Sequence, residues 1–184
     1  MKRVLVFLAN GFEECEALIV VDILRRAGIE ATTVSIHSDE RVESSHKVCL
    51  FADTTADKAE IGTYDAVVLP GGIPGTPNLA NCPTVTDTCV QFAREGKLVA
   101  AICAAPSVLA GLGLLKGKKA TIYRGMENEL LGAEHVSDEV AVDGNIVTSR
   151  SMGTAIPFAL TLVSQLLDKE TAKKLAAEIG YDHY

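Results

Sequence analysis

One of the five cysteines stands where a chain can build a nucleophile. Cys103 directly follows the apolar run LVAAI at 98–102 and precedes a helical stretch, with Ala101 and Ala105 two positions to either side. A sharp strand-to-helix turn, the nucleophile elbow, requires such small neighbours. The dipole of a helix N-terminus also favours the thiolate form. We therefore predict a reactive Cys103; the alternative is an inert cysteine at the end of a core strand.

Three acidic residues, Glu13, Glu14 and Glu16, open the first predicted helix. Helical spacing places Glu14 on a mixed, solvated face, whereas Glu13 and Glu16 both lean toward the apolar side. Acids in a first turn often only complement the helix dipole. The functional alternative is a desolvated carboxyl group that keeps its proton and donates a hydrogen bond to a thiolate. Periodicity does not choose between Glu13 and Glu16.

Gly71 and Gly72 follow the apolar run AVVLP at 66–70. Adjacent glycines allow close backbone approach and can aim N–H groups at an anion, although a plain turn needs nothing more. The segment GGIPG lacks the G-x-G-x-x-G spacing of a dinucleotide site, so we expect no nucleotide cofactor. The four histidines have no metal-ligand spacing and there is no C-x-x-C pair, so we expect no metal.

Strand-like and helical patterns alternate along the chain. The apolar patterns predict strands at 4–9, 31–36, 66–70, 98–102 and 119–123, and helices at 13–27, 78–94, 105–112, 154–167 and 169–179. Residues 41–55 indicate a short hairpin excursion, and 140–142 with 146–149 a second hairpin turning at Asp143-Gly144.

Such alternation predicts a mostly parallel sheet with helices on both faces. Ligands of these sheets bind outside the carboxyl ends of the central strands. Three loops, 10–13, 71–75 and 103–106, follow predicted strands there. We expect them to converge, and their convergence is the main indication of a functional site.

Composition narrows the class of protein. The chain has 184 residues, 48% hydrophobic and only 5% aromatic, which predicts one domain with strands buried by aliphatic side chains. A net charge of −7 without a basic block argues against a nucleic acid partner, and no apolar run is long enough to span a membrane. An odd number of widely spaced cysteines without a secretory signal favours reduced thiols and a cytoplasmic location.

Four segments occur in order along the chain: LANGFEECEA, VVLPGG, AAICAAP and TSRSMGTAIPFAL. Together they resemble the ThiJ/PfpI superfamily, nearly from end to end. The resemblance is strongest for the branch that includes the parkinsonism-associated protein deglycase and the bacterial YajL-like proteins, which the final GYDHY also resembles. The combination is highly specific for the family and less so for an activity.

The resemblance implies a flavodoxin-like, doubly wound α/β fold in one domain over residues 1–184, and a homodimer. It implies that Cys103 is the family's reactive cysteine on its elbow, and that Glu16 is the protonated acid beside the sulfur. Gly71, Gly72 and the backbone N–H of Ala104 match the family's oxyanion-binding positions.

Two departures from the family pattern bear on mechanism. A histidine of this branch that lies near the cysteine is replaced by Tyr123, which leaves Glu16 as the acid and base. The protease-like branch has histidine directly after its nucleophile, where this chain has Ala104, so peptidase activity is disfavoured. Glu13, Tyr123 and Arg150, which lies in the last motif, are secondary site candidates.

We therefore expect a cofactor-independent enzyme, similar to glyoxalases and deglycases, that acts on small dicarbonyls or glycated proteins through Cys103. The alternative is a redox-sensing chaperone or oxidative-stress protein that uses the same thiol. Both functions require Cys103 to ionise below the usual thiol pKa of about 8.5. They also require a protonated Glu16, because a charged carboxylate repels a thiolate.

Overall fold

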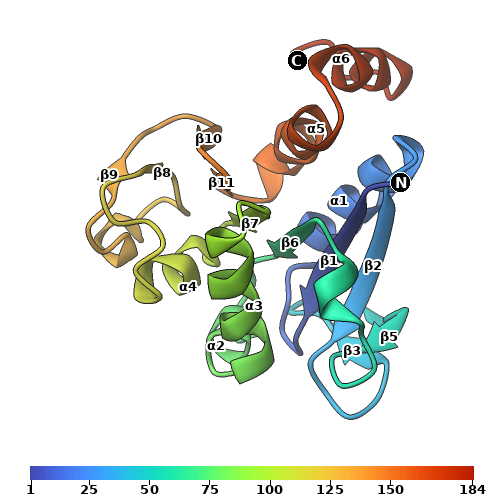
Figure 1. Ribbon diagram of the computed structural model, residues 1–184, viewed down its shortest axis with the longest axis vertical. Coiled ribbons are helices and arrows are strands. Elements are labelled where there is room, and N and C mark those ends of the chain that lie inside the picture. The colour runs from blue at the N-terminus through green and yellow to red at the C-terminus, as the bar shows by residue number, and fades with distance from the viewer.

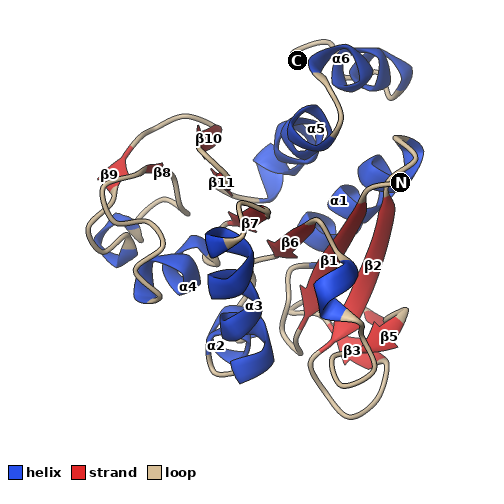
Figure 2. Ribbon diagram, viewed as in Figure 1, coloured by secondary structure: helices blue, strands red, loops and turns tan.

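The computed structural model describes residues 1–184 and is built around one seven-stranded sheet (Figures 1 and 2). The strand order is β10-β11-β7-β6-β1-β2-β5, and every neighbouring pair is parallel except β10 with β11. The strands are β1 (Arg3–Leu8), β2 (Glu30–Ser35), β5 (Thr54–Thr55), β6 (Ala66–Leu69), β7 (Leu98–Ile102), β10 (Val140–Asp143) and β11 (Ile146–Ser149). The predicted fold class is confirmed.

Six α-helices cover the two faces of this sheet. They are α1 (Glu14–Arg26), α2 (Gly75–Ala80), α3 (Pro83–Arg94), α4 (Pro106–Gly111), α5 (Ala155–Leu166) and α6 (Lys169–Glu178). Buried residues of α1, α5 and α6 share one apolar cluster, whereas those of α2, α3 and α4 belong to the other. None of these helices is long and apolar enough to cross a membrane.

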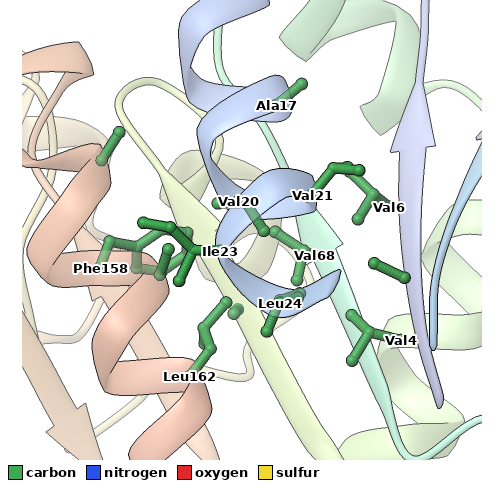
Figure 3. Close-up of a cluster of buried hydrophobic side chains, with 14 of the residues drawn as sticks. Val4, Val6, Ala17, Val20, Val21, Ile23, Leu24, Val68, Phe158 and Leu162 are labelled. Carbon is green, nitrogen blue, oxygen red and sulfur yellow. The ribbon is translucent and has the colours of Figure 1, made fainter. Parts of the chain in front are cut away.

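Alternate residues of the central strands supply the two cores. In β1, Val4 and Val6 join the cluster under α1 and α5, while Leu5 and Phe7 join the opposite one. Figure 3 shows the first cluster, where the side chains of α1 lie between those of the strands and Phe158 of α5. Because β1 is covered on both faces, apolar side chains occupy every position from Val4 to Leu8, most of them aliphatic, as the sequence predicted.

The predicted excursion at 41–55 is only partly a hairpin. Strands β3 (Arg41–Glu43) and β4 (Cys49–Phe51) pair antiparallel, as expected. The chain then returns to the main sheet, where β5 pairs in parallel with β2 and forms the edge.

Two other predicted elements are wrong in extent. The helix at 78–94 is two helices, because the chain breaks at Asn81 and Cys82, and Pro83 opens α3. The strand at 119–123 shortens to β8 (Lys119–Ala120), which pairs with β9 (Glu134–His135) outside the main sheet. Beyond β8, Thr121 donates its N–H to the Thr148 hydroxyl group and therefore leaves the ladder.

Candidate active site at the Cys103 elbow

Cys103 lies on a strained turn between β7 and α4. Its φ angle is 65°, in the left-handed region that side chains other than glycine rarely adopt. Two long-range hydrogen bonds hold the turn: Cys103 donates its N–H to Ser149 O at 3.0 Å and accepts the N–H of Tyr123 at 2.9 Å. The strain and its support match the geometry of a nucleophile elbow.

The structure distinguishes Glu16 from Glu13, which helical periodicity alone did not. Glu16 is 1% exposed, and its Oε2 accepts the N–H of Gly71 at 2.9 Å. Glu13 is the N-cap of α1 and accepts the N–H of Glu16 at 2.6 Å. Glu13 therefore starts the helix, whereas Glu16 is the buried carboxyl group beside Cys103.

Burial is the main influence on Glu16 and raises its pKa to about 7. The Cys103 thiol and the N–H of Gly71 oppose this increase, and the charge of Glu13 adds to it. Glu16 Oε1 is buried without a partner of normal hydrogen-bond geometry, although the thiol lies close enough to affect the carboxyl group. A buried oxygen without a partner favours the neutral acid.

The Cys103 thiol is less acidic than the sequence predicted. Burial, followed by the charge of Glu16 and its hydrogen bond, raises the thiol pKa to about 12. The N–H groups of Ala104 and Gly72 act in the opposite direction. The prediction relied on a helix dipole, but α4 has six residues and begins only at Pro106, and the burial of Cys103 cannot be read from the sequence. Cys103 and Glu16 thus form a coupled pair that holds one proton between the two pKa values.

Gly71 and Gly72 have different hydrogen-bonding roles at this site. Gly71 donates its N–H to Glu16 Oε2. This N–H therefore positions the acid and is not available to an oxyanion. A Cβ at Gly71 would lie 2.6 Å from Cys103 Cβ, which explains why this position has no side chain. The N–H groups of Gly72 and Ala104 lie near the sulfur and remain suited to binding an anion.

The predicted convergence of three loops is confirmed. Glu13 donates its N–H to Gly71 O at 2.9 Å, and Gly75 donates to Gly11 O at 3.1 Å. Gly71 in turn contacts the elbow at Cys103. The carboxyl ends of β1, β6 and β7 therefore meet at one site.

The secondary candidates Tyr123 and Arg150 lie together beside the elbow. They line a cavity of about 300 Å³ with Arg124 and Ser151. Sequence reasoning missed Arg124 because it follows a predicted strand and belongs to no motif. The only signal was its position next to Tyr123.

The other four cysteines lack this environment. Cys89 is buried and has a pKa raised by burial to about 12, whereas Cys15 is exposed and has a pKa raised first by partial burial and then by neighbouring acids. Cys49 is exposed on β4, where Arg41 Nη2 lies 3.1 Å from its sulfur. All five thiols are free.

Ligand atoms of Glu13, Glu14 and His46 lie within 4.8 Å of one another, which the sequence spacing did not suggest. Each already has a structural partner. Glu13 caps α1, and Glu14 pairs with His46 at 3.0 Å. The arrangement is accounted for by a helix cap and an ion pair.

The parallel sheet, the strained cysteine and the buried acid define an α/β protein of the nucleophile-elbow class. A family model described as the DJ-1/PfpI family matches residues 2–165. The chain belongs to this family, as its motifs indicated.

Known relatives cover the whole fold. The Parkinson disease protein 7 homolog of Danio rerio is 39% identical over 183 residues, which cover 97% of this chain and 96% of the relative. The glutathione-independent glyoxalase DJR-1.2 of Caenorhabditis elegans is 29% identical over 165 residues, or 89% and 87% of the two chains. The solved structure of oxidized Toxoplasma gondii DJ-1 has a TM-score of 0.96 at 39% identity and full coverage of both chains. The chain spans only 41% and 46% of two Arabidopsis thaliana relatives, DJ-1 homologs B and A.

Proposed function

We propose that the protein is a cofactor-independent enzyme that acts on small dicarbonyls, or on their adducts with protein side chains, through Cys103. The observation that carries the proposal is the coupled pair: a half-buried thiol on a strained turn beside a carboxyl group whose pKa is about 7. A group with that pKa accepts and returns protons readily at neutral pH.

The first step joins sulfur to the aldehyde carbon. Glu16 accepts the thiol proton, and the thiolate forms a C–S bond while the carbonyl electron pair moves to oxygen. The N–H groups of Gly72 and Ala104, already near the sulfur, stabilise this alkoxide. Glu16 then returns its proton to the oxygen, which gives a hemithioacetal.

A second proton transfer completes the conversion of a 2-oxoaldehyde. Glu16 removes the hydrogen from the former aldehyde carbon, and the adjacent carbon is protonated, which gives a thioester of a 2-hydroxy acid. Water hydrolyses the thioester and restores the thiol. For methylglyoxal the sum is methylglyoxal plus water giving lactic acid, so no external oxidant or reductant is needed.

One relative and one residue of this chain support an enzyme of this kind over a peptidase. One relative is named a glutathione-independent glyoxalase. Ala104 follows Cys103 directly, so no histidine there can protonate an amine leaving group, and a peptidase is disfavoured.

The test is the consumption of methylglyoxal with formation of lactate by the purified protein. Cys103→Ser is expected to reduce the rate by at least about a hundredfold. Cys15→Ser, at an exposed cysteine of α1, serves as the matched control and is expected to retain the rate. Equal turnover by wild type and Cys103→Ser would refute the proposal.

A redox role is the second candidate, and the same N–H groups favour it. A sulfinate at Cys103 would accept hydrogen bonds from Gly72, Ala104 and a protonated Glu16. One solved relative carries the description "oxidized". Mild peroxide is expected to change the protein's ability to suppress aggregation of a model substrate if this is the main role, and an unchanged ability excludes it.

We also propose a homodimer in the cytoplasm. Leu18 of α1 and Phe51 of β4 are 43% and 78% exposed, which is high for large apolar side chains, and five free thiols suit a reducing compartment. Light scattering is expected to give twice the 19.5 kDa chain mass. Phe51→Asp is expected to shift the mass toward one chain.

A further inference from the structure

The cavity beside the elbow has an unusual lining for so acidic a chain. Tyr123, Arg124, Arg150 and Ser151 line its volume of about 300 Å³, and no acidic residue is among them. The whole chain carries a net charge of −7. Two guanidinium groups, a phenol and a hydroxyl group therefore form a local cationic site on an anionic molecule.

This cavity is fixed to the elbow through the backbone of Cys103 itself. The N–H of Cys103 bonds to Ser149, and Arg150 is the next residue along the chain. The carbonyl group of Cys103 bonds to Tyr123, and Arg124 is the next residue. Each arginine is thus one residue away from a direct contact with the nucleophile's own peptide groups.

The two arginines are largely available to a ligand. Arg150 contacts Glu139 Oε1 and Ser137 O only at 3.4 Å each, and the Glu139 side chain is 58% exposed. Arg124 is exposed and has no acidic group within ion-pair distance. Planar guanidinium groups bind carboxylates through paired N–H donors, which a neutral dicarbonyl such as methylglyoxal cannot use.

We propose that this cavity binds a carboxylate on the substrate, so that the protein prefers 2-oxoaldehydes that carry a negative charge at the end remote from the aldehyde. The inference rests on the proposed function and specifies its substrate class. Arg124 and Arg150 pair with the carboxylate while the aldehyde carbon meets Cys103. A suitable probe is 4,5-dioxopentanoate, which with one water gives 2-hydroxyglutarate by the same proton transfers.

The first experiment compares 4,5-dioxopentanoate with its methyl ester, which has the same carbonyl groups and no charge. Wild type is expected to prefer the acid in kcat/KM by about tenfold or more at low salt, since each exposed charge contact contributes about fivefold. Arg124→Gln and Arg150→Gln are expected to raise KM for the acid more than for the ester, and the double variant to abolish the preference.

Two variants test whether the effect is local. Arg94→Gln removes the same charge at the end of α3, next to the start of β7 and away from the elbow, and is expected to keep the preference. Glu139→Gln removes the acid that competes for Arg150 and is expected to increase it. A preference that falls equally in Arg94→Gln would assign the effect to overall charge and overturn the proposal.

A second experiment does not depend on turnover. Iodoacetate and iodoacetamide alkylate the same thiol and differ in charge, and mass spectrometry measures their rate ratio at Cys103. The Arg124→Gln/Arg150→Gln double variant is expected to lower the iodoacetate-to-iodoacetamide ratio at least about fivefold. A lowered ratio without dicarbonyl turnover would refute the proposed enzyme and keep the anion site. Turnover with an unchanged ratio and no preference for the acid would refute the anion site alone.

Discussion

The chemistry of a single residue, Glu16, decides how the site works. Its carboxyl group titrates at about 7, whereas the Cys103 thiol opposite an ionised Glu16 titrates at about 12. The pair therefore loses its first proton near neutrality, and the remaining proton is shared between sulfur and oxygen. Nucleophilic thiolate arises within this pair only while Glu16 holds the proton.

This sharing predicts a particular effect of Glu16→Gln. In the wild type, alkylation of Cys103 by iodoacetamide is expected to rise with an inflection at pH about 7, where the pair loses its first proton. Glutamine cannot accept the thiol proton, and burial still raises the thiol pKa, so the inflection is expected at higher pH.

The measurement is the alkylation rate of Cys103 by mass spectrometry between pH 5 and pH 10. Glu14→Gln is the matched control, because Glu14 pairs with His46 and takes no part in the coupled pair. An inflection at or below the wild-type value in Glu16→Gln would show that Glu16 is not the proton acceptor.

At the scale of elements, the site depends on how closely the loop after β6 approaches the elbow after β7. Gly71 lies at the contact, with Ile102 O and Glu16 Oε2 at 3.0 Å and 2.7 Å from where a Cβ would stand. The acid lies in the first turn of α1, which follows β1, whereas the glycine and the cysteine directly follow the ends of β6 and β7. Their positions relative to one another therefore depend on the register of these three strands.

Gly71→Ala is expected to disrupt this contact. The new methyl group would overlap Cys103 Cβ at 2.6 Å, and the overpacking is expected to destabilise the fold by about 1–3 kcal/mol. Dicarbonyl turnover is expected to fall more steeply than stability, because the displaced groups are the reacting ones. Urea unfolding and kcat measure the two effects. Gly62→Ala, where no atom lies within 4 Å, is the control, and similar losses in both variants would contradict the explanation.

The sequence predicted these elements well where local pattern and burial agree. The run at 98–102 became β7 without change, and the three loops met as expected. The prediction of one helix at 78–94 was wrong, because the apolar spacing continues across a break that Pro83 imposes. The strand at 119–123 failed because the N–H groups of Thr121 and Tyr123 bond to Thr148 and Cys103, partners that are distant in sequence.

The site residues likewise include some that local sequence identifies and some that depend on the folded structure. Cys103 was recognisable from its small neighbours and its place after a strand. The choice of Glu16 over Glu13 required the family resemblance, since both residues lie on the inward side of one helix turn. The prediction of a low thiol pKa was wrong, because the pKa depends on the depth of burial and on the charge of Glu16. Both are properties of the folded molecule.

For the whole molecule, a buried acid with a raised pKa links stability to pH. A carboxyl group whose pKa rises from 4.5 to about 7 stabilises the folded state fully below pH 4.5, and that stabilisation is lost as the pH rises through about 7. At roughly 1.4 kcal/mol per unit, the loss amounts to about 3 kcal/mol.

Glu16→Gln is therefore expected to make the protein more stable at pH 8, by up to about 3 kcal/mol, and to leave its stability nearly unchanged at pH 4. Urea unfolding at the two pH values measures the difference. Loss of dicarbonyl turnover together with the gain in stability would show that the wild-type fold is less stable in order to keep the site reactive. Equal stability of wild type and variant at pH 8 would mean that Glu16 is not desolvated as the structure shows.

The two hydrogen bonds that hold the Cys103 peptide also set the order in which the protein becomes active during folding. Their partners, Ser149 and Tyr123, lie 46 and 20 residues beyond the cysteine, and Ser149 ends a strand that must first align with β7. Contacts so distant in sequence form late, because the intervening chain has to be ordered before they do. We therefore expect a newly made or refolding chain to bring its nucleophile into position only after β11 has paired with β7. In a partly folded chain Cys103 is therefore an ordinary exposed thiol with a pKa of about 8.5, without the neighbouring Glu16 and the N–H groups of Gly72 and Ala104 that the folded site provides.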